Sequence, residues 1–242
     1  MPAKVALVTG AARRLGAGIA EILHQEGFNL VLHFRSSRQD ALALRERLEK
    51  RRPGSVRLVH AHLDTVAAVE SLVAEAVGAW GRLDVLVNNA SAFYPTPLGK
   101  ATEAQWEELL ASNLKAPFFL SQAAFPQLRQ WRGCVVNLAD VYALRPRAGF
   151  PIYSVAKAGL AAMTRSLALE MAPEVRVNAV APGAILWPEG AVSEADKAEL
   201  LNSLPLKRMG RGADIAKAVR YLVCDADYVT GQILAVDGGR SL

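Results

Sequence analysis

The sequence predicts an α/β protein in which a parallel sheet of about seven strands is covered by helices on both faces. Short, almost wholly apolar runs of strand length alternate along the chain with longer stretches of helical periodicity. Such alternation is typical of a doubly wound sheet, whose ligands bind at the carboxyl ends of the strands. We expect one domain over residues 1–242, because no linker, repeat or low-complexity tract divides the chain.

The expected elements follow one another with few irregular stretches. In chain order, the expected strands cover residues 4–9, 29–34, 55–61, 84–88, 133–139, 175–181 and 232–236, and the expected helices cover 14–26, 38–51, 66–80, 103–130, 152–172, 193–203 and 212–224. Residues 89–102 and 184–211 remain largely irregular, and each stretch follows a strand end. A stretch as long as 184–211 is often a lid or binding loop, so we expect it to form a substrate loop.

Composition favours a globular protein that acts on small molecules. The chain is 52% hydrophobic and has a net charge of +5, which suits a phosphate-rich cofactor better than a nucleic acid. A basic run near residues 45–52 is expected to be a solvated helix face. Cys134 and Cys224 lack metal-site spacing and are expected to be free thiols, with no metal bound. No signal-peptide pattern or bilayer-length apolar run is present, so we expect a cytoplasmic protein without membrane or nucleic-acid partners.

A glycine-containing turn joins the first expected strand to the first helix. The run Thr9-Gly10-Ala11-Ala12-Arg13-Arg14-Leu15-Gly16 lies between them. Glycine permits a tight turn and a close approach of the backbone to a pyrophosphate, while a helix N-terminus supplies amide groups. A glycine motif alone is weak, but this strand–turn–helix context favours a dinucleotide-binding site over an ordinary turn.

The end of the second expected strand favours a phosphorylated cofactor. An acidic residue there binds the ribose diol of NAD, whereas an arginine suits a 2′-phosphate. This chain has Arg35 at that position, followed by Ser36 and Ser37. A guanidinium matches phosphate geometry and keeps its charge. We therefore infer NADPH rather than NADH; the alternative is that Arg35 is a solvated loop residue.

Three residues predict acid–base chemistry at the same edge of the sheet. Tyr153 and Lys157 are four residues apart in an expected helix, so they share one helix face. Asp140 ends an apolar strand thirteen residues before Tyr153. A nearby ammonium is expected to lower the pKa of the phenol, which can then deliver a proton near neutral pH. Together with the glycine turn, the trio predicts a reductase that uses a nicotinamide cofactor.

These motifs resemble the short-chain dehydrogenase/reductase family over nearly the whole chain. The family's glycine loop, its Asn-Asn-Ala (residues 88–90), its helix asparagine (Asn113), its Tyr-x-x-x-Lys pair and its Pro-Gly (Pro182 and Gly183) all occur in order. The resemblance implies a Rossmann fold and oxidoreductase activity. Family members pair helices such as 103–130 and 152–172 in dimers and tetramers, so by analogy we expect a homotetramer.

Two departures from the usual family pattern narrow the resemblance. Arg14 stands where the family usually has a second glycine, and Asp140 stands where it usually has a catalytic serine. Both replacements are similar to those of pteridine reductases in this family, as are the segment from Asn89 to Leu98 and the ending Val236-Asp237-Gly238-Gly239 followed by Ser241-Leu242. The resemblance implies a pterin or folate substrate.

Roles follow from the resemblance residue by residue. It implies a catalytic set of Asp140, Tyr153, Lys157 and Asn113, with Asn113 positioning Lys157. It implies that the cofactor contacts Gly10, Arg13, Arg14, Leu15, Gly16, Arg35, Ser36, Ser37, Leu63, Asn89, Ala90, Tyr153, Lys157, Pro182 and Gly183. It implies that the substrate contacts Arg14, Ser91, Phe93, Asp140 and Tyr153, with Phe93 stacking on the pterin. His62 departs from the family, which commonly has Asp there.

Other interpretations remain open at this point. The protein could reduce a carbonyl, such as that of a 3-oxoacyl thioester, although an ionised Asp140 cannot donate to a carbonyl oxygen. It could instead bind NADPH as a regulator without turnover, although the intact Tyr153–Lys157 pair argues against that. Trp187 could be a substrate wall or loop packing. The sequence does not distinguish biopterin, dihydromonapterin and dihydrofolate, which share the bicyclic head.

Overall fold

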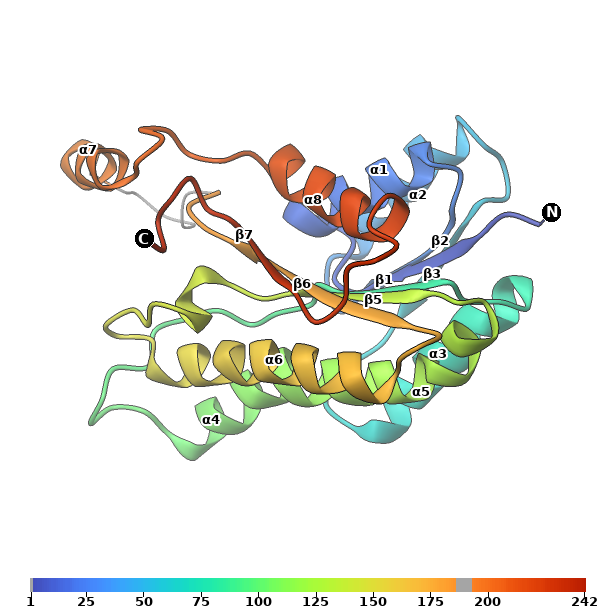
Figure 1. Ribbon diagram of the computed structural model, residues 1–242, viewed down its shortest axis with the longest axis horizontal. Coiled ribbons are helices and arrows are strands. Elements are labelled where there is room, and N and C mark those ends of the chain that lie inside the picture. Colours follow the sequence, from blue (N-terminus) through green and yellow to red (C-terminus); the bar gives the residue numbers. More distant parts are fainter. Residues whose placement is uncertain (1, 186–192) are drawn as a thin grey trace.

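Seven parallel strands form one sheet in the computed structural model, which describes residues 2–185 and 193–242 (Figure 1). The strands are β1 (Val5–Val8), β2 (Asn29–Phe34), β3 (Val56–His60), β4 (Val85–Asn88), β5 (Cys134–Leu138), β6 (Arg176–Pro182) and β7 (Ile233–Val236). Their order in the sheet is β3-β2-β1-β4-β5-β6-β7, and every neighbouring pair is parallel. The predicted doubly wound α/β fold is confirmed.

Helices cover both faces of this sheet. They are α1 (Arg14–Gln25), α2 (Arg38–Glu49), α3 (Val66–Trp80), α4 (Glu103–Leu110), α5 (Ala116–Gln130), α6 (Pro151–Glu170), α7 (Glu194–Ser203) and α8 (Gly212–Cys224). Figure 1 shows α1, α2 and α8 on one face and α3 to α6 on the other. Buried apolar clusters fill both interfaces, for example around Leu23 and Ile215 on one face and around Leu72 and Leu120 on the other. In the described part of the chain, no helix is both long and apolar enough to cross a membrane.

The single helix predicted over 103–130 is divided in the structure. A π-helical turn, η1 (Ala111–Lys115), separates α4 from α5. A π turn inserts an extra residue, and such turns are frequent at functional sites. Here it carries Asn113, which is 1% exposed and whose amide donates to the carbonyl of Leu109 at 3.0 Å. The apolar pattern runs through this turn without interruption, which is why the sequence predicted one helix.

A chain of buried polar side chains fixes α6 against the sheet. Asn88 on β4 donates to Asn137 on β5 at 2.8 Å, and Asn137 donates to Thr164 on α6 at 2.9 Å. The Thr164 hydroxyl donates to the carbonyl of Leu160 at 2.8 Å. Because buried polar groups need partners, these bonds specify one placement of the helix that carries Tyr153 and Lys157.

The switch in strand order places the ligand site. β1 pairs with β2 on one side and with β4 on the other, so the connections leave β1 and β4 in opposite directions. A crevice forms where the order reverses, at the carboxyl ends of the strands. A cavity of about 1190 Å³ lies there.

Candidate active site

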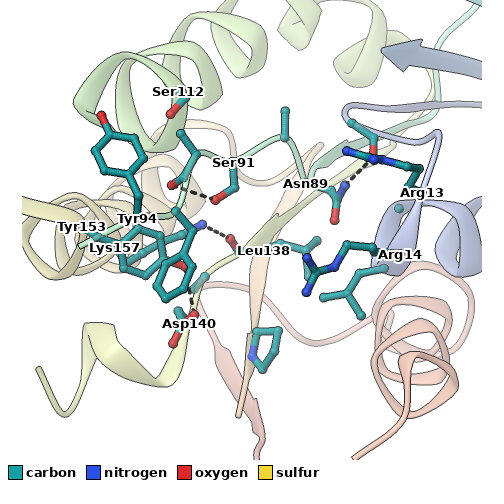
Figure 2. A pocket seen from close by; sticks show the side chains of 18 of the residues that line it. Arg13, Arg14, Asn89, Ser91, Tyr94, Ser112, Leu138, Asp140, Tyr153 and Lys157 are labelled. Atoms are coloured by element: carbon teal, nitrogen blue, oxygen red, sulfur yellow. Dashed lines mark hydrogen bonds between the residues drawn. The ribbon is translucent and has the colours of Figure 1, made fainter. Parts of the chain in front are cut away.

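The cavity brings together nearly all the site residues that the sequence predicts. Figure 2 labels seven of them: Arg13, Arg14, Asn89, Ser91, Asp140, Tyr153 and Lys157. The cavity walls include every predicted cofactor residue, namely Gly10, Arg13, Arg14, Leu15, Gly16, Arg35, Ser36, Ser37, Leu63, Asn89, Ala90, Tyr153, Lys157, Pro182 and Gly183. Ser91, Phe93 and Asp140 line it as well, and so do Leu200 and Met209 from the predicted substrate loop. Asn113 is not among the lining residues, and Trp187 lies outside the described residues.

The glycine turn is held against the end of β4 by Asn89. The Asn89 side-chain amide donates to the carbonyls of Thr9 and Gly10 at 2.8 and 3.0 Å. Gly10 has a φ of 59°, a conformation that glycine adopts without strain. A Cβ on Gly16 would collide with the carbonyl oxygen of Gly10 and with the Asn89 amide. Both glycines are therefore required by backbone geometry.

Arg14 occupies a conformation that explains the usual family glycine. Its φ is 52°, in the left-handed region that side chains rarely adopt. The chain accepts this strain at the first residue of α1, where the guanidinium lines the cavity. Backbone strain retained at a site residue points to a function for its side chain.

His33 on β2 positions the glycine turn. The Gly10 N–H donates to His33 Nδ1 at 3.2 Å, and His33 Nε2 lies 3.1 Å from the carbonyl oxygen of Ala61. A neutral imidazole with its proton on Nε2 satisfies both contacts. Burial lowers the His33 pKa to about 4, so this neutral form prevails at neutral pH. The proximity of His33 to the strand end with Arg35 was the signal available in the sequence.

The far end of the cavity carries the predicted phosphate-binding residues. Arg35, Ser36 and Ser37 all line it, and so does His62, which was not predicted to bind the phosphate. The ring of His62 lies edge-to-face with that of His60, with centroids 5.7 Å apart. His60 Nε2 lies 2.8 Å from the carbonyl oxygen of Arg35. The departure from the family at His62 thus falls beside the predicted cofactor site.

Tyr153 and Asp140 form a direct hydrogen bond. The Tyr153 hydroxyl donates to Asp140 Oδ2 at 2.9 Å, and the N–H of Tyr142 donates to Asp140 Oδ1 at 2.9 Å. Burial raises the pKa of Asp140, opposed by the Tyr142 bond and the Lys157 charge. Burial also raises the pKa of Tyr153 well above its usual value, reinforced by the charge of Asp140. The expectation of a lowered phenol pKa is therefore wrong for the protein alone, because burial and the charge of Asp140 both raise the Tyr153 pKa.

Lys157 is fully enclosed beside this pair. Its ammonium donates to the carbonyl of Leu138 at 2.7 Å and lies 5.6 Å from the centroid of the Tyr153 ring. Burial lowers the Lys157 pKa to about 8, while the charge of Asp140 opposes that change. The lysine therefore remains largely protonated at neutral pH.

Asn113 connects the π turn to the loop after β4. The Ser91 hydroxyl donates to Asn113 Oδ1 at 2.7 Å, and Asn113 Nδ2 donates to the carbonyl of Ala92 at 3.0 Å. The structure thus places Asn113 against the irregular stretch 89–102 at Ser91 and Ala92, while Lys157 donates to the carbonyl of Leu138. That Asn113 positions Lys157 stays a prediction.

Phe93 forms part of an aromatic wall that is open to the cavity. Its ring stacks on Phe150 with centroids 4.8 Å apart and an interplanar angle of 8°. It also meets the edge of Tyr153 at 4.8 Å. Phe93 is 47% exposed, so it is not a core residue. One large aromatic surface therefore lies beside the Tyr153 ring.

Sequence reasoning missed several further lining residues, among them a group of four. Tyr142, Arg147, Phe150 and Arg240 come from the turn after β5, the start of α6 and the end of the chain. No motif marks them, because they meet only after folding. Arg240 stands between Gly239 and Ser241, inside the ending that resembles pteridine reductases, and this position was the one signal in the sequence that pointed to it.

Comparison with known proteins identifies the family. A family model described as enoyl-(acyl carrier protein) reductase matches residues 10–241. The chain belongs to the short-chain dehydrogenase/reductase family. It is accordingly an oxidoreductase by family, as the sequence predicted.

Three relatives of this short-chain reductase cover almost its whole length. It is 36% identical to pteridine reductase 1 of Leishmania tarentolae, over 99% of this chain and 97% of that protein. It is 38% identical to 3-oxoacyl-[acyl-carrier-protein] reductase FabG of Staphylococcus aureus, over 98% and 97% respectively. A crystal structure of blue fluorescent protein from a metagenomic library, in complex with NADPH, superposes with a TM-score of 0.92 at 36% identity, covering 99% of this chain and 98% of that one.

Proposed function

We propose that this protein is an NADPH-dependent pteridine reductase that reduces a pterin, a dihydropterin or dihydrofolate. The observation that carries the proposal is the 2.9 Å hydrogen bond from Tyr153 to Asp140, at the position where the family resemblance implies serine. A pterin offers amine and ring N–H groups, which a carboxylate accepts well. A ketone offers only an acceptor, and Asp140 has no proton for it: the ionised form has none, and the acid form donates its single proton to the Tyr153 oxygen.

The cofactor half of the cavity fits NADPH. The glycine turn and the N-terminus of α1 present backbone amides to a pyrophosphate, and Arg35 with its neighbouring serines suits a 2′-phosphate. The solved relative with NADPH bound supports the same choice. Bound NADPH supplies the hydride; Tyr153 and Lys157 border the cavity where the nicotinamide ribose would be held.

Proton delivery falls to Tyr153 and Asp140. Reduction of a C=N bond adds hydride to carbon and a proton to nitrogen. Tyr153 provides that proton, Asp140 in its acid form returns one to the phenol oxygen, and solvent restores Asp140. The Lys157 ammonium stabilises the negative charge that passes through the pair. Phe93 provides a flat surface on which the bicyclic head stacks.

A second candidate is 3-oxoacyl thioester reduction, which the 38% identity to the staphylococcal reductase favours. The two candidates differ in what Asp140 must do. A carbonyl oxygen needs a donor in the place of Asp140, so replacing this residue with serine should improve thioester reduction and impair pterin reduction.

NADPH oxidation followed by absorbance tests the proposal. Dihydrobiopterin, dihydromonapterin, dihydrofolate and an acetoacetyl thioester would be separate substrates, with NADH as the cofactor control. We expect turnover with pterins, and a loss of about 10²- to 10⁴-fold in kcat for D140N and Y153F, the usual contribution of acid–base catalysis. Undiminished pterin turnover by either variant, or turnover with the thioester alone, would refute the proposal.

A further inference from the structure

Two arginines converge on Tyr142 at one side of the cavity. Arg147 Nη1 donates to Tyr142 Oη at 3.2 Å, and Arg240 Nη2 donates to the same oxygen at 3.3 Å. Their guanidinium carbons lie 5.8 and 5.5 Å from the centroid of the Tyr142 ring. Two like charges therefore share one neutral phenol, and all three residues line the cavity.

Both guanidinium groups are open to an anion, although the charge of Arg240 also acts on the Asp140 carboxyl and lowers its pKa. Within residues 2–185 and 193–242, no ion pair joins Arg147 or Arg240 to an acidic side chain. Arg147 is exposed and Arg240 is partly exposed, so both retain N–H groups for a ligand. Tyr142 Oη accepts from both arginines and has its own proton left to donate. The cluster therefore presents two cations and a hydroxyl donor, which is the chemistry that binds an anion.

The cluster is fixed in place by the backbone around it. Arg145 Nη1 donates to the carbonyls of Arg240 and Leu242, which ties the end of the chain to the turn after β5. Asp237 accepts from the N–H groups of Gly239 and Ser241 at 2.9 and 2.7 Å. Arg240 is thus presented by an ordered turn that forms only in the folded protein.

This cluster lies beside the reacting groups. Tyr142 comes two residues after Asp140, and its ring is edge-on to Tyr153 with centroids 6.5 Å apart. The guanidinium of Arg147 also lies 4.8 Å from the centroid of Phe150, which stacks on Phe93. Arg147 therefore borders the aromatic wall. Arg13 and Arg14, from the glycine turn, lie across the pocket from Asp140 and Tyr153 (Figure 2).

We propose that Arg147 and Arg240, together with Tyr142, form a subsite for an anionic side chain of the substrate. The inference rests on the proposed function: a pterin head stacked on Phe93 would extend its substituent toward this pair. The preferred substrate is then a pterin whose side chain carries a carboxylate or a phosphate, and not one with an uncharged side chain. Binding energy from such a remote group would appear mainly in KM.

The test compares charged with uncharged substrates in R147Q and R240Q, at saturating NADPH. Dihydrofolate carries carboxylates and dihydrobiopterin carries none. We expect kcat/KM for dihydrofolate to fall about tenfold in each variant, through KM, which is the usual size of one charge-assisted contact. The value for dihydrobiopterin should change less than about twofold. In the wild type, added KCl should raise the KM for dihydrofolate only.

R45Q is the matched control, because Arg45 is exposed on α2 and does not line the cavity. It removes the same charge and should leave both substrates unchanged. An equal loss for both pterins in R147Q and R240Q, or no loss for either, would overturn the subsite. Inorganic phosphate tests whether the subsite accepts a phosphate as well as a carboxylate. If phosphate competes with dihydrofolate in the wild type and not in R240Q, the subsite also accepts phosphates.

Failure of the proposed function gives a different result. If the wild type oxidises NADPH only with thioesters, pterin reduction is refuted. The subsite is then tested with acetoacetyl coenzyme A, which bears phosphates, against the uncharged acetoacetyl N-acetylcysteamine thioester. A selective loss for the coenzyme A ester in R147Q and R240Q would support an anion subsite, and a parallel loss would refute it.

Discussion

Protonation of His33 should destabilise the protein in mildly acidic solution. The side chain is 2% exposed. Its Nδ1 accepts the Gly10 N–H while its Nε2 bonds the carbonyl of Ala61. An imidazolium has donors only, so its Nδ1–H would face the N–H of Gly10. The folded protein therefore resists protonation at this position.

The size of the effect follows from the pKa. Burial lowers the His33 pKa from 6.5 to about 4, and the charges of His60 and Arg35 add to the lowering. Between these two values the unfolded chain binds more protons than the folded protein. The contribution is therefore complete above pH 6.5 and is lost as the pH falls toward 4. It amounts to about 3 kcal/mol of unfolding free energy.

Urea denaturation of the wild type and of H33N, from neutral pH down to pH 4, measures the contribution of His33 to the unfolding free energy. Asparagine does not titrate and keeps an acceptor for the Gly10 N–H. H33N should be less stable at neutral pH but should lose less stability on acidification. His24, whose pKa burial also lowers, is present in both proteins and cancels in the difference. An equal loss of stability on acidification in the two proteins would show that the folded protein does not lower the pKa of His33.

Three further changes test separate parts of the structure. Burial lowers the Lys157 pKa to about 8, so NADPH affinity that depends on the Lys157 ammonium should weaken as the pH rises through about 8. Fluorescence titration with NADPH measures this affinity, and K157M should bind NADPH weakly at every pH. R35D should shift the kcat/KM ratio from NADPH toward NADH by about a hundredfold, because it replaces a phosphate partner with a diol partner; an unchanged ratio would show that Arg35 is a solvated residue. Asp84 accepts hydrogen bonds from the buried Arg82 guanidinium and from the N–H of Val5. D84N should therefore lower the unfolding free energy, measured by urea denaturation, by about 3 kcal/mol. A decrease below about 1 kcal/mol would contradict a stabilising buried ion pair.

The fold was predictable because its signals are local. Val5–Val8 is an unbroken apolar run and is wholly buried in the centre of the sheet, as the pattern for a parallel strand requires. Likewise Thr65 caps α3 through a bond from the Ala68 N–H, and Gly81 ends that helix with a φ of 70°. Each boundary is encoded within a few residues of itself.

The unpredicted features depend on contacts between distant segments. The π turn at Asn113 is stabilised partly by the carbonyl of Ala92 and the hydroxyl of Ser91, about twenty positions earlier in the chain. The pairing of Arg147 with Arg240 joins segments 93 positions apart through Tyr142. Residue types alone do not show that such groups will meet. Sequence motifs identified residues that recur in the family, and the structure identified residues that meet only in the folded chain.

Asp140, which stands where the family usually has serine, changes the group to which the Tyr153 hydroxyl donates its proton. In the structure the phenol donates to the carboxylate, so with Asp140 ionised this proton is directed away from a substrate. A protonated Asp140 can instead donate to the phenol oxygen, which frees the Tyr153 proton for a ring nitrogen. Burial raises the Asp140 pKa and so favours this acid form. Pterin reduction should therefore decline as the pH rises through that pKa, a dependence that D140S should lack because serine does not titrate there. A pH–rate profile of the same shape in both enzymes would mean that Asp140 binds the substrate without taking part in proton delivery.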